Sequence, residues 1–448
     1  MTTNAARTHT LVFGLGQTGL SCIQFLQRQN QPIVVFDTRK KPTNMPSDIE
    51  QYTETLPEKV WDKISRVVMS PGVDPTTPIL EPARQLKLPI ISDIELFAQH
   101  AKAPIIGITG TNAKSTVTTL VTALINASGK TALVGGNIGI AALDLFDQPT
   151  PDYYVLELSS FQLEMTDHMH TKVSALLNFS ANHLDRHLTL DAYWAAKSHI
   201  FNHCDYAVTH HNLKNRVQPL VKTLLTFGLT PDQHDTGVYY ENGIIYYQNQ
   251  PLLTQQDLSQ SLFGQHNLEN VLAALTIISP LKLPAESFKK MLQQFKGLPY
   301  RCCLSGEWNQ IRWFNDSKST TIGATIAAIK GIQPHGKHLI LLLGGLSKGQ
   351  DFHDLTATIN ESVDHVVVFG QDKQLIADAV SVKPTYLMDT VKDAVHFAQY
   401  LAKPGDQVLF SPACASLDQF EGYMHRGRVF DECVQRVNET PTTYSDKT

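Results

Sequence analysis

Short apolar runs alternate with amphipathic segments along most of the chain. Residues 11–14 (LVFG), 32–36 (PIVVF) and 66–70 (RVVMS) have the length of buried strands, and helix-like segments separate them. Continuous apolar strands that alternate with helices are typical of a parallel sheet built from βαβ units. The pattern predicts a first, Rossmann-like α/β domain over residues 1–97.

A second series of the same kind follows this domain. Residues 103–110 (APIIGITG) read as a strand that leads through a turn into an amphipathic helix over 114–129. Further strands and a hairpin are expected at 153–158 (YYVLEL), 173–179 (VSALLNF) and 237–249 (GVYYENGIIYYQN). We predict a central domain over residues 98–298, with a parallel sheet of the P-loop ATPase kind and additional β-structure.

A third series begins after GLPYR, residues 297–301. Its strand-like runs lie within 311–321 (IRWFNDSKSTT), 338–346 (HLILLLGGL), 365–370 (HVVVFG) and 406–416 (DQVLFSPACAS). A last helix is expected to end near Val437. This series predicts a C-terminal, Rossmann-like α/β domain over residues 299–448, so the fold class is α/β with three domains.

The composition excludes several classes of partner. The 448 residues include 37 Lys and Arg against 42 Asp and Glu without a long run of one sign, so neither nucleic acid nor a membrane surface is an expected partner. No stretch approaches the roughly 20 apolar residues that span a bilayer, and the first residues lack the features of a signal peptide. Six cysteines are scattered without a CxxC pair. We expect a soluble, cytoplasmic monomer.

Two glycine-containing turns follow predicted strands. In GLGQTG, Gly14, Gly16 and Gly19 would let the backbone approach a diphosphate, and Asp37 at the end of the next strand could reach a ribose hydroxyl. This motif alone is weak evidence, because any tight strand-to-helix turn uses glycine. In GITGTNAKST, residues 107–116, backbone N–H groups would cradle phosphates, although the spacing departs from the strict Walker pattern.

Other polar residues form two sets, one in the central part of the chain and one downstream. The central set is Asn137, Glu157, His183 with Asp185, and Lys197, and the downstream set is Asn267, Asn270, Arg301, Asp316, Lys318, Lys348 and Ser416. Carboxylate and imidazole groups that meet at a phosphate loop would suit Mg²⁺. Each residue also has a plain alternative: a helix N-terminal acid for Glu157, a loop cap for His183, a solvated helix lysine for Lys197, and turns and N-caps downstream.

The order and spacing of these segments resemble the Mur ligase family over essentially the whole chain. The resemblance rests on GITGTNAKST, GGNIG, ELSSFQLE, HLDRH with YWAAK, GQHNLEN, GLPYR, NDSKSTT, GGLSKG and SPACASLDQF. At the N-terminus, GLGQTGLS, DTR, SPG and ISDIELF are similar to the uridine-diphosphate domain of the D-glutamate-adding branch. The resemblance implies an ATP-dependent ligase of peptidoglycan precursor synthesis, a process tied to cell shape and division, that joins D-glutamate to UDP-N-acetylmuramoyl-L-alanine through an acyl phosphate.

The resemblance also implies a role for each matching residue. ATP would be held by Gly110, Thr111, Asn112, Ala113, Lys114, Ser115, Thr116, Asn267, Asn270, Arg301 and Asp316. Two Mg²⁺ ions would share Ser115, Glu157, His183 and Lys197. The UDP substrate would be bound by Leu15, Thr38, Arg39, Gly72 and Asn137, and D-glutamate by Lys318, Thr320, Lys348, Ser416, Leu417 and Tyr423. Lys114, His183 and Lys197 would be catalytic, with Lys197 carbamylated.

The chain departs from the family pattern in three places. Ala113 replaces a usual glycine in the phosphate loop, RCCL after Tyr300 lacks an acid that the family often has, and GLSKG is an unusual version of its loop. If position 113 needs a positive φ, alanine adds strain of about 1–2 kcal/mol.

Alternative functions remain open at this point. Another Mur ligase or a folylpolyglutamate synthase would share the central and C-terminal motifs. An NAD(P)-binding oxidoreductase would explain only the first glycine motif with Asp37. A P-loop binding module without turnover would bind ATP and release no phosphate.

Overall fold

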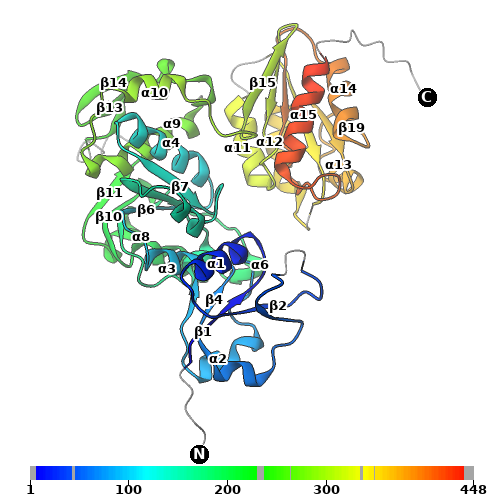
Figure 1. Ribbon diagram of the computed structural model, residues 1–448. Coiled ribbons are helices and arrows are strands. Elements are labelled where there is room, and N and C mark those ends of the chain that lie inside the picture. Colours follow the sequence, from blue (N-terminus) through cyan, green and yellow to red (C-terminus); the bar gives the residue numbers. More distant parts are fainter. Residues whose placement is uncertain are drawn as a thin grey trace, which may run out of the picture. The chain divides into compact units, whose positions relative to one another are not determined.

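The computed structural model describes residues 7–42, 46–229, 237–262, 264–332, 337–347 and 349–437 (Figure 1). The chain divides into two compact units. One contains residues 1–257 and 269–291, and the other contains 258–268 and 292–448. Within the described residues, no helix is both long and apolar enough to cross a membrane.

The first sheet is entirely parallel. Its strands are β1 (His9–Phe13), β2 (Ile33–Asp37), β3 (Glu50–Thr53), β4 (Ile64–Met69) and β5 (Ile90–Ser92), in the order β3-β2-β1-β4-β5. The accompanying helices are α1 (Gln17–Arg28), α2 (Glu81–Gln85) and α3 (Asp93–Ala98). Leu11, Val12 and Phe13 of β1 are fully buried, as expected for a strand covered on both faces. This order is that of a Rossmann-like sheet.

The second sheet has six parallel strands. They are β6 (Ile105–Thr109), β7 (Ala132–Gly136), β8 (Tyr153–Glu157), β9 (Thr171–Leu176), β10 (Cys204–His210) and β11 (Leu224–Phe227), in the order β11-β10-β9-β6-β8-β7. The helices in this part of the chain are α4 (Lys114–Ala127), α5 (Ser160–Leu163), α6 (Leu184–His187), α7 (Leu190–Ser198), α8 (Lys214–Val217), α9 (Gln265–Ile278) and α10 (Phe288–Gln294). Because β6 lies between β8 and β9, the strand order reverses there, and ligands bind at the carboxyl ends of such strands.

A small antiparallel sheet follows in the same unit. Its strands β12 (Tyr239–Glu241), β13 (Ile244–Tyr247) and β14 (Gln250–Thr254) pair in sequence order. Asn242 and Gly243, between the first two strands, have φ of 50° and 83°, which suits a two-residue hairpin turn. The predicted hairpin is confirmed.

The third large sheet lies in the other unit. It consists of β15 (Cys303–Trp308), β16 (Ile311–Asn315), β17 (Leu339–Gly344), β18 (His365–Phe369), β19 (Thr385–Leu387) and β20 (Gln407–Phe410), in the order β15-β16-β20-β17-β18-β19. Only β15 runs antiparallel. The helices are α11 (Ile322–Ile332), α12 (Thr356–Ser362), α13 (Lys373–Ala379), α14 (Val391–Leu401) and α15 (Tyr423–Val437). Leu341 and Leu343 belong to one core cluster and Leu342 to another, so β17 is buried on both faces.

One hydrophobic core joins the first and second sheets. It includes residues from α1, α3, β6 and β8. The ring of Phe97 stacks on Phe146 at 4.7 Å and meets Tyr154 edge to face at 5.0 Å. The helix that ends the first α/β series is therefore anchored by aromatic packing against the second.

Candidate active site

The loop between β6 and α4 is held closed by its own lysine. Lys114, the first residue of α4, donates from Nζ to the carbonyl oxygens of Gly110 and Thr111, at 2.9 Å each. The N–H of Asn112 donates to Asn178 Oδ1 at 2.8 Å. The loop lies at the amino terminus of a 14-residue helix, where N–H groups and the helix dipole favour phosphate. The predicted phosphate loop therefore has the required surroundings.

Asn178 was not among the residues that the sequence analysis singled out. It lies two residues after β9, and its Nδ2 also donates to the carbonyl of Asn112 at 3.2 Å. Its position just past the carboxyl end of a parallel strand was the signal that could have identified it. Thr116 lies in the first turn of α4 and is partly exposed.

Ala113 adopts the left-handed conformation that the usual glycine would favour. Its φ is 64° and its ψ is −4° at the N-cap of α4. An L-residue in this region costs about 1–2 kcal/mol, whereas glycine there costs about 0.4–1 kcal/mol through the unfolded chain. The loop therefore tolerates the strain rather than avoiding it.

Replacing Ala113 with glycine should stabilise the protein by about 0.5–1 kcal/mol, the difference between these two effects. Urea unfolding followed by circular dichroism measures this change. The matched control is Ala123→Gly in the middle of α4, which should cost about 1 kcal/mol because ordinary helical backbone disfavours glycine. A lower stability of Ala113→Gly than of the wild type would contradict the strained conformation.

Glu157 is buried at the end of β8 and bound by two neighbours. The residue is 3% exposed, and Ser115 Oγ donates a hydrogen bond to its Oε2. Asn137 Nδ2 donates to Oε1 at 2.7 Å, and the Asn137 N–H donates to the Glu157 carbonyl at 2.8 Å. Gly136 has a φ of 93°, and a Cβ there would lie 2.5 Å from that carbonyl oxygen. The structure thus brings three predicted residues together from three segments, and the GGNIG motif needs its glycine for this approach.

Lys197, on α7, points into the protein toward the phosphate loop. The residue is 1% exposed, and Nζ donates to the carbonyl of Gly110 at 2.9 Å and to Thr109 Oγ1 at 3.2 Å. Nζ also lies 4.9 Å from the centre of the Tyr193 ring. The alternative reading of Lys197 as a solvated helix lysine is therefore wrong.

The surroundings of Lys197 disfavour its charged form. Burial and, to a smaller extent, the nearby positive charge of Lys114 lower the pKa of its amine to about 6, although the negative charge of Glu157 acts in the opposite direction. At neutral pH the neutral amine therefore predominates.

His183 lies on the exposed side of this cluster. It has a φ of 53°, and its ring lies 5.0 Å from that of Phe161 and 6.3 Å from that of Tyr193. His187 at the end of α6 is buried, and its Nε2 hydrogen-bonds Ser160 Oγ at 3.0 Å. His187 also packs against the rings of Phe161 and Tyr193. These aromatic contacts fix the segment that carries His183 near the phosphate loop.

A pocket of about 210 Å³ opens beside the phosphate loop. It is lined by Leu177, Asn178, His210, Asn212, Phe227, Glu269, Asn270 and Ala273. Asn178 connects this pocket to the loop, so Asn270 lies in a pocket next to the predicted phosphate loop. Asn267 instead lines a cavity of about 520 Å³ within the other unit, where its Nδ2 donates to the Ser261 carbonyl at 3.4 Å. The structure therefore does not place the two asparagines in one pocket.

The carboxylate of Asp37 is occupied by its own chain. Oδ2 accepts from the Leu15 N–H at 2.8 Å, and both oxygens accept from the Arg39 guanidinium, at 2.9 and 2.7 Å. These hydrogen bonds, led by that of Arg39, lower the pKa of Asp37 to about 2 despite partial burial. In this arrangement Asp37 fixes the loop after β1 and does not offer a free oxygen to a ribose hydroxyl. The sequence does not reveal this role of Asp37, because its hydrogen-bond donor, the Leu15 N–H, is a backbone group in another turn.

Two further residues predicted for the UDP substrate follow the strands β2 and β4. Thr38 and Gly72 are exposed, and a Cβ built on Gly72 would meet nothing within 4 Å. Gly19 needs to be glycine, since a Cβ there would lie 1.8 Å from the carbonyl oxygen of Gly14. Glycine therefore serves close packing of α1 on β1 in this motif.

In the C-terminal unit, several predicted residues gather at the carboxyl end of the sheet. Asp316 is buried just after β16, accepts from Ser411 Oγ at 2.7 Å, and accepts from the Cys302 N–H at 3.1 Å. Burial raises the pKa of Asp316 to about 7 against these hydrogen bonds and the charge of Arg301. Lys318 Nζ lies 3.9 Å from the centre of the Tyr423 ring.

The remaining predicted residues of this unit differ in their exposure. Ser416 is buried, Leu417 is 63% exposed, and the carbonyl of Thr320 accepts from Gln350 Nε2 at 3.4 Å. Lys348 and the side chain of Asp185 lie outside the part of the chain that the structure describes.

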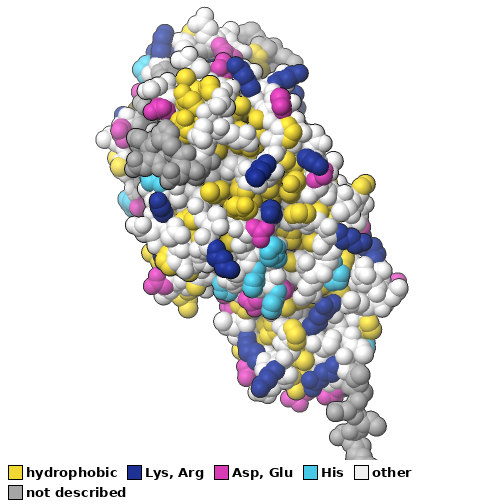
Figure 2. Space-filling model, turned by 90° about the vertical axis from the view of Figure 1, so that its left-hand side faces the viewer, with side chains coloured by type: hydrophobic (Ala, Val, Ile, Leu, Met, Phe, Trp, Pro, Cys, Tyr) yellow, Lys and Arg dark blue, Asp and Glu magenta, His cyan; other side chains and the backbone are white. Residues whose placement is uncertain are grey.

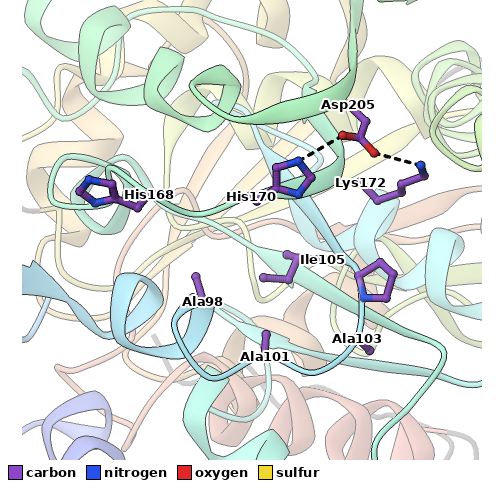
Figure 3. A pocket seen from close by; sticks show the side chains of 9 residues that line it. Ala98, Ala101, Ala103, Ile105, His168, His170, Lys172 and Asp205 are labelled. Atoms are coloured by element: carbon purple, nitrogen blue, oxygen red, sulfur yellow. Dashed lines mark hydrogen bonds and ion pairs between the residues drawn. The ribbon is translucent and has the colours of Figure 1, made fainter.

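A different cavity, of about 360 Å³, lies at the opposite edge of the second sheet. Lys172 and Asp205, at the amino ends of β9 and β10, line it together with His170 (Figure 3). Asp205 accepts from His170 Nε2 at 3.1 Å and from Lys172 Nζ at 2.9 Å, so its charge is neutralised locally. Imidazoles and carboxylates also gather on the face drawn in Figure 2. This cavity is separated from the phosphate loop by the length of the strands and is not part of the candidate site.

An all-parallel sheet with a phosphate loop at its switch point, a buried glutamate beside that loop and a further α/β unit define a phosphate-loop nucleotide-binding protein. Three family models match the chain. They describe a Mur ligase MurD-like N-terminal domain over residues 8–92, a Mur ligase middle domain over 108–278 and a Mur ligase glutamate ligase domain over 300–414. The chain belongs to the Mur ligase family.

Curated relatives align over nearly the full length. The UDP-N-acetylmuramoylalanine–D-glutamate ligase of Nitrosococcus oceani is 40% identical over 441 residues, covering 96% of each chain. The ligase of the same name from Alcanivorax borkumensis is 40% identical over 436 residues, covering 95% of this chain and 98% of the relative.

Solved structures share the fold at low identity. The UDP-N-acetylmuramate-alanine ligase of Thermotoga maritima has a TM-score of 0.60 at 16% identity, covering 96% of this chain and 99% of that one. A pseudomurein peptide ligase type C from Methanothermus fervidus has a TM-score of 0.61 at 16% identity, covering 96% and 100%. The α/β fold predicted from the sequence is thereby confirmed.

Proposed function

We propose that this protein is the ATP-dependent ligase that joins D-glutamate to UDP-N-acetylmuramoyl-L-alanine in peptidoglycan precursor synthesis, with release of ADP and phosphate. The observation that carries the proposal is the cluster at the carboxyl end of the second sheet. There the phosphate loop, the buried Glu157 and the buried Lys197 meet within one unit. Relatives about 40% identical over nearly the whole chain bear the name of this ligase.

The donor set at the phosphate loop fits Mg²⁺. Ser115 Oγ and the Glu157 carboxylate are oxygen ligands in hydrogen-bond contact, and oxygen is what this hard cation prefers. Among the described residues, no group of three or more His, Cys, Asp and Glu side chains is arranged to hold a metal ion, so phosphate oxygens and water would complete a site here. Mg²⁺ would neutralise the negative charge of the ATP phosphates. His183 and Lys197 would serve a second ion, in keeping with the family resemblance.

Lys197 is proposed to act as a carbamate. A protonated amine would repel Mg²⁺, whereas a carbamate offers it an oxygen anion. The neutral amine, favoured by burial, attacks the carbon of CO₂, a C–N bond forms, and the nitrogen loses one proton to solvent. The resulting group carries one negative charge on its two oxygens. Full burial of this lysine beside a phosphate loop supports this assignment over a structural role.

The roles of the residues follow from where their atoms lie. Lys114 Nζ donates hydrogen bonds to two loop carbonyls in this structure. With ATP bound, it would instead contact the transferring phosphoryl group and stabilise its charge. The substrate carboxylate would accept this phosphoryl group, the amine of D-glutamate would attack the acyl carbon, and phosphate would leave as the amide forms. The phosphate loop and pocket would hold ATP through Gly110, Thr111, Asn112, Ala113, Lys114, Ser115, Thr116 and Asn270, with Asn267, Arg301 and Asp316 from the other unit.

The two other substrates are assigned to residues that follow the carboxyl ends of strands. The UDP end is proposed to contact Leu15, Thr38, Arg39, Gly72 and Asn137, and D-glutamate is proposed to contact Lys318, Thr320, Lys348, Ser416, Leu417 and Tyr423. We propose domain limits of 1–97, 98–298 and 299–448 for these three tasks. A cytoplasmic monomer is proposed as the working form.

Phosphate release should require ATP, Mg²⁺, UDP-N-acetylmuramoyl-L-alanine and D-glutamate together. A coupled phosphate assay over a panel of D- and L-amino acids measures this requirement, with single omission of each component as the control. Equal turnover with L-glutamate or L-alanine would reject this member of the family and favour another ligase. Nucleotide binding without phosphate release under every condition would favour a binding module.

A further inference from the structure

Arg426, on α15, is a fully buried arginine that the proposed mechanism does not use. The residue is 0% exposed. Its Nε donates to Ser317 Oγ at 3.1 Å and one terminal nitrogen donates to the Ser317 carbonyl at 2.8 Å. The other terminal nitrogen has no hydrogen-bond partner among the described residues. A buried guanidinium with an unsatisfied N–H donor is unusual in a protein interior.

The charge of this guanidinium is not neutralised by contact. Burial lowers the pKa of Arg426 to about 10, so the group is still positive at neutral pH. The groups that favour its charge are Cys414, Asp418 and Asp316, and neither aspartate forms an ion pair with Arg426 in the described structure. Burying an unpaired charge is costly, and substitution by an apolar residue of similar size is often neutral or stabilising. A role other than stability would explain why arginine stands here.

The segments proposed to receive D-glutamate converge on Arg426. Ser317, its hydrogen-bond partner, lies between Asp316 and Lys318, and Ser317 Oγ donates to the carbonyl of Tyr423 at 2.9 Å. The loop after β17 passes next to the unpaired terminal nitrogen of Arg426. A Cβ built on Gly345 would lie 3.2 Å from that nitrogen and 3.2 Å from the Cβ of Cys414.

This close approach depends on the backbone of the loop. Gly345 has a φ of 126°, and the N–H of Leu346 donates to the carbonyl of Ala415 at 2.9 Å. The loop after β17 is therefore tied to the segment that carries Ser416, and both lie against the guanidinium. The loops that contain Ser317, Gly345 and Cys414 therefore all lie near the buried guanidinium of Arg426, which α15 carries.

We propose that Arg426 is a positioning residue that sets the preference for an acidic amino acid. It holds the 317, 345 and 414–416 loops in register and keeps a fixed positive charge beneath the surface that they form. A substrate with two carboxylates is favoured there over its neutral amide, because the charge acts at short range through a water-poor interior. This inference rests on the proposed function, since it assigns D-glutamate to these loops.

The test compares Arg426→Lys and Arg426→Met with Arg428→Met, a control on the same helix whose arginine is exposed and lies 3.9 Å from Glu432. KM for D-glutamate should rise about tenfold to a hundredfold in Arg426→Met, the scale of a lost charge-assisted contact. Arg426→Lys should recover part of this loss. kcat at saturating D-glutamate and KM for the UDP substrate should stay near wild type, as should every constant of Arg428→Met.

A second measurement separates positioning from structure. The ratio of kcat/KM for D-glutamate to that for D-glutamine should fall in Arg426→Met, whereas its thermal midpoint should be unchanged or higher. An unchanged KM for D-glutamate, a fall in kcat alone, or failure of both Arg426 variants to fold would each overturn the proposal. Phosphate release by the wild-type protein with D-glutamate is measured before any variant is assayed. If the wild type releases none, the proposed function fails, and the proposal for Arg426 is not what has been disproved.

Discussion

Replacing Lys197 with alanine should remove most of the ligase activity, with a loss in kcat of about 10²-fold or more, the scale on which preorganised electrostatic groups act. The reason is the position of its Nζ, buried 2.9 Å from the carbonyl of Gly110 at the phosphate loop. The proposed carbamate would supply an oxygen anion to a second Mg²⁺, and alanine would supply none. Steady-state phosphate release at saturating substrates measures the loss. The matched control is Lys214→Ala, since Lys214 is an exposed lysine on α8 and should leave the rate unchanged.

Short carboxylic acids should restore part of this activity. Removal of the lysine side chain leaves space beside Thr109 and Tyr193, and acetate can place an oxygen anion there. Added acetate or formate should therefore raise the rate of Lys197→Ala and not that of the wild type. Carbon-13 bicarbonate should also give a carbamate resonance in the wild type that is missing in the variant. Full activity in Lys197→Ala, or no labelled carbamate in the wild type with Mg²⁺ present, would contradict the assignment.

The burial of Lys197 shows what a sequence pattern reveals and what it does not. The helix over 190–198 contains Tyr193 and Lys197 four residues apart, hence on one face. Tyr193 is almost fully buried, so its neighbour on that face is buried too. This spacing was a usable signal, but a lysine at the end of an alanine-rich segment reads equally well as solvated. Only the packing of α7 against the phosphate loop decides between the two readings.

Predictions that depended on parallel strands were reliable for a physical reason. Carboxyl ends of neighbouring parallel strands meet at one edge of the sheet, so Glu157 at the end of β8 and the loop after β6 had to be close. The partners of Asp37 were not predictable in this way. A carboxylate that follows a glycine-containing turn can face a ligand or close onto the turn, and the hydrogen bond from the Leu15 N–H settles it in favour of the turn.

The family resemblance assigned Asn267 and Asn270 to one ligand, ATP. The structure instead places Asn270 in the pocket beside the phosphate loop and Asn267 in a cavity of the other unit. Their helix spans the boundary between the two units, and no local pattern marks such a boundary.

Replacing Lys114 with alanine should lower kcat by about 10²–10³-fold, because the phosphate loop loses the cation that stabilises the transferring phosphoryl group. Lys114 Nζ now donates to two loop carbonyls, so its flexible chain already reaches across the loop where phosphate oxygens would lie. Single-turnover measurement of acyl phosphate formation tests the effect on chemistry directly. The fold should persist, because the backbone of α4 and the Asn112–Asn178 contact do not involve this side chain.

The control for the Lys114 substitution is Lys130→Ala, since Lys130 is an exposed lysine paired with Asp152 beyond the end of α4. It should leave kcat unchanged because exposed ion pairs contribute little. Thermal unfolding should show that both variants are folded at the assay temperature. If Lys114→Ala turns over at a near-normal rate, the loop between β6 and α4 does not hold the reacting phosphates. The Lys197 result would then have to be explained without a nucleotide in this loop, since both side chains donate to the same Gly110 carbonyl.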